Sequence, residues 1–76
     1  MIKERVIQII EEQFGKDAGT VKLTDSLIEN LGGDSVDTLE ISLLLETEFK
    51  IEISSEESAD NLIIEDLIKL VESKCQ

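Results

Sequence analysis

Ser35 is the residue whose type and setting best suit covalent chemistry, because its hydroxyl stands where a helix is expected to begin. Gly32 and Gly33 precede it and allow a sharp turn out of the preceding loop. Asp34 has the type of an N-cap residue, and Asp37 stands where the acid of a capping box would. This setting directs the Ser35 hydroxyl outward and makes it a candidate attachment point. An ordinary capping or solvated serine is the alternative, since serine is common at helix starts.

The composition excludes most catalytic uses of this serine. The chain has no histidine, so it can form neither a Ser-His nor a Cys-His nucleophile pair, and it offers no imidazole to a metal ion. It contains no GxxxxGK loop for binding a nucleotide phosphate. It also has no acidic loop with EF-hand spacing, so no metal site is expected. Attachment of a group to Ser35 is therefore favoured over catalysis by it.

The charge of the chain restricts its partners. The formal net charge is −11, and residues 23–49 contain seven acids with no lysine or arginine. Such a field repels the phosphates of nucleic acids and anionic membrane surfaces. We therefore expect basic protein surfaces as partners, no nucleic acid and no membrane insertion. Repulsion between like charges also favours a monomer.

Length and composition indicate a single domain over residues 1–76. With 41% hydrophobic residues the chain is too apolar for a disordered acidic tail, yet it has no apolar run of membrane-spanning length. Its single cysteine, Cys75, cannot form an internal disulfide and is expected to be an exposed free thiol. No signal peptide is visible, so we expect a cytoplasmic protein.

Hydrophobic spacing and capping residues predict an all-α fold. The expected helices run over residues 2–14, over about 35–49, from 55 to near 60 or 61, and from 64 past 71, with Lys74 near the end of the last helix. A loop of about twenty residues joins the first two helices, with one turn of helix expected near residues 25–29. The expected architecture is a four-helix bundle with a short third helix and a long loop between helices 1 and 2.

The expected second helix is apolar on two sides. Its apolar residues form two nearly opposite groups: Val36, Leu39 and Leu43, and Ile41, Leu45 and Phe49. A helix of this kind is expected to be sandwiched between neighbours.

These features together resemble the acyl carrier proteins, small acidic helical bundles that carry acyl groups on a 4′-phosphopantetheine arm. Residues 31–36, Leu-Gly-Gly-Asp-Ser-Val, correspond to the family's Asp-Ser-Leu motif, with valine in place of the usual leucine. Residues 37–40, 46–49 and 52–57 are also similar, as is the first helix, so the resemblance covers the whole chain.

The resemblance implies a non-catalytic function. A phosphopantetheinyl transferase would join 4′-phosphopantetheine from coenzyme A to Ser35, and the arm would carry growing acyl chains as thioesters to fatty acid biosynthesis enzymes. Gly33 is also common in carriers of assembly lines, so a carrier for polyketide, nonribosomal peptide or specialised lipid synthesis is the alternative. A more distant alternative is an unmodified acidic helical adaptor that binds basic proteins.

Two further sets of residues are candidates for binding. Acids on or beside the second helix are expected to dock basic enzyme surfaces: Asp34, Asp37, Glu40, Glu46 and Glu48. Apolar residues are expected to line an acyl pocket beside Ser35: Leu39, Leu43, Ile53, Ile64 and Leu67. A solvated charged face and ordinary core packing are the respective alternatives.

Overall fold

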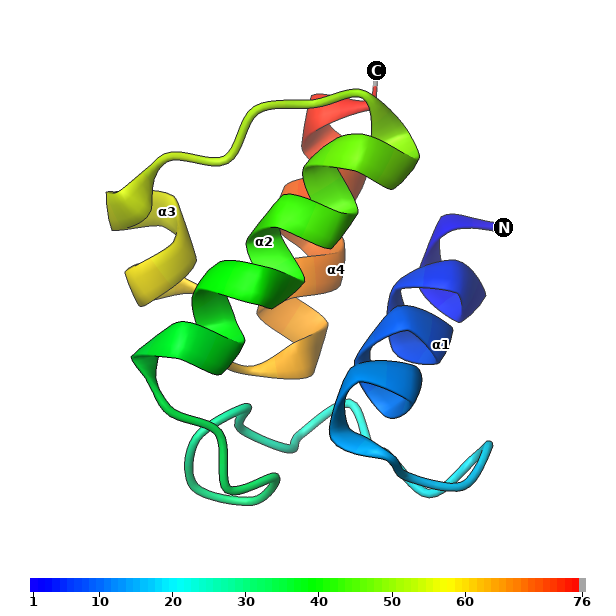
Figure 1. The fold of residues 1–76 in the computed structure, drawn as a ribbon. Coiled ribbons are helices and arrows are strands. Elements are labelled where there is room, and N and C mark those ends of the chain that lie inside the picture. Colours follow the sequence, from blue (N-terminus) through cyan, green and yellow to red (C-terminus); the bar gives the residue numbers. More distant parts are fainter. Residues whose placement is uncertain (76) are drawn as a thin grey trace.

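The structure, a computed structural model, describes residues 1–75 and contains four α-helices (Figure 1). The helices are α1 (Ile2–Phe14), α2 (Ser35–Phe49), α3 (Ser55–Asp60) and α4 (Ile64–Lys74). Residues 1–75 contain no β-strand, but Ser26 and Ile63 form an isolated antiparallel β-bridge. The predicted all-α bundle, with its short third helix and long first loop, is confirmed. No helix in the described part of the chain combines the length and apolarity that a bilayer crossing requires.

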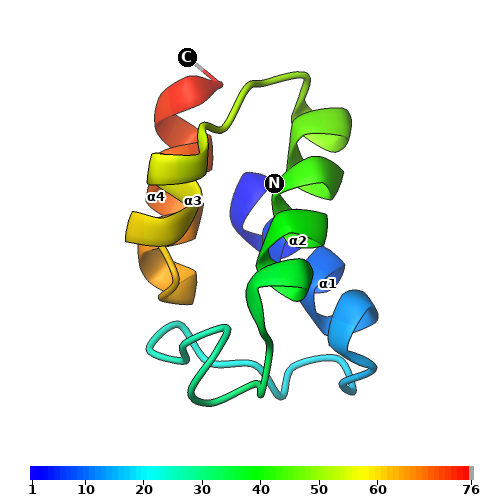
Figure 2. The same cartoon turned by 60° about the vertical axis from the view of Figure 1, so that its left-hand side comes forward.

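The helices are arranged around α2, which contacts both α1 and α3 (Figure 1). Helices α2 and α4 run in the same direction and α1 runs in the opposite one. The loop of residues 15–34 crosses one end of the bundle, where α2 and α4 both begin (Figure 2). This loop therefore positions the start of α2.

The core is aliphatic and draws on α1, α2, α4 and the long loop. Its buried residues are Val6, Ile9, Ile10, Val21, Leu27, Ile41, Leu45, Ile64, Leu67, Ile68 and Val71. Each removes apolar surface from water, which is the main favourable contribution to folding. The apolar residues of α1, which recur at helical spacing, thus face the other helices.

The prediction that α2 is sandwiched is confirmed only in part, because α2 contacts α1 and α3 but only one of its two apolar sides is buried. Ile41 and Leu45 are buried, but the opposite side of the helix is open, with Val36 and Leu39 each 58% exposed and Leu43 52% exposed. The reason is the size of α3, which has six residues, none of them buried, and does not cover this side. Amphipathic spacing identified both apolar sides but not which one has a partner.

The long loop is held by side chains that capture backbone amides. The carboxylate of Glu11, buried on α1, accepts hydrogen bonds from the amides of Gly19 at 2.8 Å and Val21 at 3.5 Å. The hydroxyl of Ser26 accepts from the amides of Ile28 and Glu29, both at 3.2 Å. The expected turn of helix near residues 25–29 is confirmed in part. No regular helix forms, but the amide of Asn30 donates to the carbonyl of Ser26 at 3.1 Å, the four-residue spacing of an α-helix, and the Ser26 hydroxyl caps this turn.

The loop also completes the start of α4. Ile63 at the N-cap position makes no side-chain capping bond. Instead the amide of Ile64 donates to the carbonyl of Asp25 at 3.0 Å, and the amide of Glu65 donates to the carbonyl of Leu23 at 2.9 Å. Backbone groups of the loop thus satisfy amides that a helix start leaves without partners.

Candidate functional site

Ser35 is the first residue of α2 and is exposed. The preceding Asp34 is the N-cap, and its Oδ1 accepts hydrogen bonds from the amides of Val36 and Asp37, both at 3.0 Å. In return, Asp37 Oδ2 accepts from the amide of Asp34 at 3.1 Å. The predicted capping box is confirmed, and it fixes the backbone on both sides of Ser35.

The two glycines before Ser35 serve different purposes. Gly32 has φ +73°, a left-handed conformation that residues with a Cβ rarely adopt. Gly33 is buried, and a Cβ built there would lie 2.8 Å from the carbonyl oxygen of Leu27 and 2.9 Å from Cζ of Phe14. The expectation that both glycines provide unusual dihedral angles therefore holds for Gly32 alone. Gly33 is required for space, because it lets the chain pass close to the long loop.

Ser35 lines a cavity of about 440 Å³ where α2 faces α3 and the segment before it. Two residues of the expected acyl pocket, Leu39 and Ile53, also line this cavity. The other three do not. Ile64 and Leu67 are 0% and 2% exposed and belong to the core.

Leu43 lies elsewhere, in a second groove between α1 and α2 that Gln13, Glu40, Leu44 and Thr47 also line. The helical period explains this placement, because Leu43 is on the open side of α2 and more than half exposed. The residues of the expected pocket therefore lie in three places: the cavity beside Ser35, the core, and the groove between α1 and α2.

The inner part of the cavity carries hydroxyl groups that the sequence did not single out. Ser42 on α2 is buried, and its Oγ lies 2.9 Å from Oγ of Ser58 on α3. Glu46, one turn further along α2, accepts a hydrogen bond through Oε2 from the amide of Ile53 at 2.9 Å. These contacts join α3 and its preceding segment to α2. Their partners are far apart in sequence, so no local pattern marks them.

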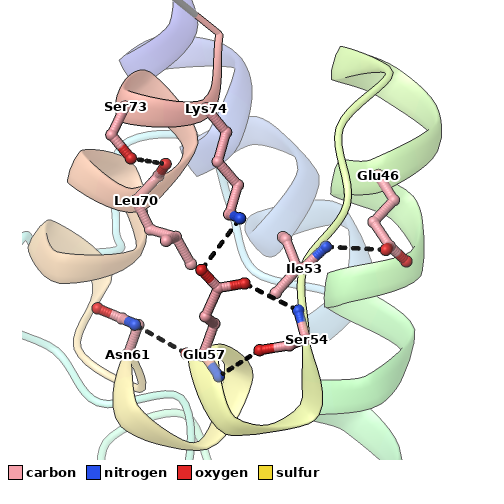
Figure 3. A network of polar contacts seen from close by, with 8 residues as sticks. All are labelled: Glu46, Ile53, Ser54, Glu57, Asn61, Leu70, Ser73 and Lys74. Atoms are coloured by element: carbon pink, nitrogen blue, oxygen red, sulfur yellow. Dashed lines mark hydrogen bonds and ion pairs between the residues drawn. The ribbon is translucent and has the colours of Figure 1, made fainter.

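A second polar network holds α3 against the end of α4 (Figure 3). Glu57 accepts from the amide of Ser54 at 2.9 Å through Oε1 and from Nζ of Lys74 at 3.0 Å through Oε2. The hydrogen bond from the Ser54 backbone, followed by that from Lys74, lowers the pKa of Glu57 below its ordinary value. The capping box predicted at Ser54 and Glu57 is confirmed, and Lys74 adds a tertiary contact to it.

The five acids expected to dock partners do not share one face of α2. Asp34 at the N-cap and Asp37 three residues later form the capping box. Glu46 faces the cavity. The remaining two contact α1: Glu40 accepts a hydrogen bond from Gln13, and Glu48 forms an ion pair with Arg5.

The ion pair between α1 and α2 joins Arg5 Nη2 to Glu48 Oε1 at 3.1 Å. This single hydrogen bond, which Arg5 donates and Glu48 accepts, lowers the pKa of Glu48 and raises the pKa of Arg5. Both side chains are more than a third exposed, so the pair contributes little to stability.

An exposed apolar strip on α2, formed by Val36, Leu39 and Leu43, begins beside Ser35. Each of the three is more than half exposed, and Leu44 next to them is 42% exposed. Contiguous apolar residues on a small protein's surface commonly mark an interaction site. The sequence indicated their spacing but assigned them to buried contacts.

Residues 4–71 match the family described as phosphopantetheine attachment site. The chain belongs to this family. It is also similar to a solved structure, the crystal structure of an acyl carrier protein from Thermotoga maritima, with a TM-score of 0.78 and 32% sequence identity. The match covers 97% of this chain and 91% of that one.

The resemblance to acyl carrier proteins is thus confirmed in both sequence family and fold. The chain is an acyl-carrier-like protein whose cofactor is phosphopantetheine and whose function is to carry rather than to catalyse. In the described residues, no three of its acidic and cysteine side chains come close enough together to hold a metal ion.

Proposed function

We propose that Ser35 is the attachment residue and that the chain acts as a single carrier domain, presenting acyl thioesters on its arm to biosynthetic enzymes. The observation that carries this proposal is the position of Ser35, exposed at the first residue of α2 and on the rim of a cavity. An exposed hydroxyl on a fixed backbone is accessible to a transferase and leaves room for a covalent group. The phosphopantetheine itself would supply the thiol that bears the acyl group.

The start of α2 favours a mobile arm. A helix N-terminus attracts phosphate through its free amides, but here the amides of Val36 and Asp37 already donate to the Asp34 carboxylate. The carboxylates of Asp34 and Asp37 also repel a phosphate on Ser35. We therefore expect the phosphate to make no lasting contact with these amides. NMR relaxation of the modified protein tests this, and an arm as rigid as the backbone would contradict it.

The open side of α2 is the surface we propose for partner docking. It combines the apolar strip of Val36, Leu39 and Leu43 with Glu40, which is exposed beside it. The carboxylates steer basic enzyme surfaces to α2, and the strip contributes apolar contact once they meet. Asp34, Asp37, Glu46 and Glu48 surround this surface and add to the negative field. Glu40→Gln should slow association with a phosphopantetheinyl transferase at low salt, and Glu4→Gln on α1 is the matched control.

As the pathway we propose fatty acid synthesis in the cytoplasm, which the continuous match to the family's second helix favours. A carrier for polyketide, nonribosomal peptide or specialised lipid synthesis is the second candidate. The hydroxyl groups of Ser42 and Ser58 favour it, because they place polar groups where a fatty chain would meet the inner cavity. The acyl groups found on protein purified from its native cell would separate the two.

Loading with the arm tests the proposal directly. Incubation with coenzyme A and a phosphopantetheinyl transferase should add one arm to the intact protein, as measured by mass spectrometry. Ser35→Ala should gain none, whereas Ser55→Ala, which removes another exposed hydroxyl of the same cavity, should gain one. Loading of Ser35→Ala would refute the assignment. Failure of the unaltered protein to load would instead favour the unmodified acidic adaptor.

A further inference from the structure

We propose that the cavity beside Ser35 selects short acyl groups that carry a hydrogen-bond donor, a hydroxyl or an ammonium group, over alkyl chains of the same length. This inference rests on the proposed function, because the cargo reaches the cavity only from an arm on Ser35.

The first observation is where the cavity ends. Ser42, only 6% exposed, forms a hydrogen bond of 2.9 Å with Ser58 between α2 and α3. The core residues Ile64 and Leu67 do not line the cavity. A long alkyl chain that entered the core between Ser42 and Ser58 would separate the two hydroxyls and leave them without partners, which is costly for buried polar groups. The cavity therefore favours short cargo.

The second observation is the hydrogen-bonding capacity of its inner wall. When one hydroxyl of the Ser42–Ser58 pair donates to the other, the second still has a hydrogen to donate, and both oxygens keep acceptor capacity. Glu46 also lines the cavity, and its carboxylate accepts hydrogen bonds only. Acceptors thus outnumber donors, and a cargo that donates is the better match.

The third observation is charge. The cavity lining includes the carboxylate of Glu46, and its described residues include no lysine or arginine. A cargo with a free carboxylate, such as a dicarboxylic half-thioester, would be repelled, whereas an ammonium group would be attracted. The apolar side chains of Leu39 and Ile53 complete the wall and suit the short carbon skeleton.

The test compares cargoes of matched length on the arm-bearing protein: butyryl, 3-hydroxybutyryl, 3-aminobutyryl and succinyl. NMR chemical shifts of the Ser42 and Ser58 amides report how often the cargo occupies the cavity. One net hydrogen bond predicts occupancy about 2- to 12-fold higher for 3-hydroxybutyryl than for butyryl. The 3-aminobutyryl form should behave like the hydroxylated one, and succinyl should be the weakest.

Variants separate cavity chemistry from general effects. Ser42→Ala should reduce the difference between 3-hydroxybutyryl and butyryl, with Ser58 and Glu46 remaining as acceptors. Ser58→Ala should reduce it in the same way from α3 and replaces Ser42→Ala if that buried substitution prevents folding. Ser73→Ala, a change of the same type on α4 outside the cavity, should leave the difference intact. Equal occupancy by butyryl and 3-hydroxybutyryl on loaded protein would overturn the cargo inference alone. Failure to load Ser35 at all would overturn the proposed function with it.

Discussion

Gly33→Ala is the substitution whose effect follows most directly from the structure. The added Cβ would lie 2.8 Å from the carbonyl oxygen of Leu27 and 2.9 Å from Cζ of Phe14. The Phe14 ring is a side chain and can rotate away. The Leu27 carbonyl is backbone, and it already accepts a hydrogen bond from the amide of Gly33 at 2.9 Å. The loop must therefore move away from α2 at this point.

Overpacking of this kind costs typically about 1–3 kcal/mol. For a domain of this size, each kcal/mol lowers the melting temperature by about 4–8 °C. A loss of about 2 kcal/mol thus corresponds to a decrease of roughly 8–16 °C. Because Gly33 lies two residues before Ser35, the displaced loop should also slow loading of the arm.

Chemical denaturation and thermal melting followed by circular dichroism measure the stability change. Gly32→Asn is the matched control, since its site is open and asparagine tolerates a left-handed conformation. It should cost less than Gly33→Ala. Adding Phe14→Leu to Gly33→Ala should not restore stability, because the contact with the Leu27 carbonyl remains. A Gly33→Ala protein as stable as the original, or full rescue by Phe14→Leu, would refute this explanation.

Three other predictions concern charge and capping. Asp34→Ala should lose about 1 kcal/mol of stability in denaturant titrations, whereas Asp34→Asn should retain most of it, because asparagine also caps helix starts well; equal losses would argue against the cap. Glu57→Gln should be less stable than the original protein at pH 7 but equal to it in strong acid. Because the folded-state pKa of Glu57 lies below its ordinary value of 4.5, the ionised carboxylate stabilises the fold above pH 4.5, and this stabilisation is lost as the pH falls through the lowered pKa. Glu56→Gln on the same helix is the control, and a difference that persists in acid would contradict the assignment. Raising the salt concentration from 0.01 to 0.15 M shortens the screening length from about 30 to about 8 Å and should raise the melting temperature by reducing repulsion within a chain of net charge −11; a lower melting temperature would contradict this.

Local patterns were sufficient to predict the helices and two of their starts. The capping boxes at Asp34 and Ser54 each involve a partner three residues away, so the sequence displays both members together. The end of α1 is also a local signal, because a glycine such as Gly15 readily takes the left-handed conformation that ends a helix. The position of Ser35 at a helix start was therefore predictable.

Contacts between distant segments were not predictable. The tight packing of Gly33 against Phe14, the capture of loop amides by Glu11 and the bond between Ser42 and Ser58 all depend on tertiary arrangement. The residues of the expected acyl pocket are dispersed for the same reason, since helical spacing says which residues share a side but not what faces that side.

The most direct test of the account is to locate the arm on the loaded protein. Cleavage after lysine releases residues 23–50 as one peptide, which contains the three serines Ser26, Ser35 and Ser42. Fragmentation of this peptide by tandem mass spectrometry distinguishes them. We predict that the phosphopantetheine is found on Ser35 alone. Its presence on Ser26 or Ser42, or an unmodified peptide from protein that has gained the arm, would contradict the account.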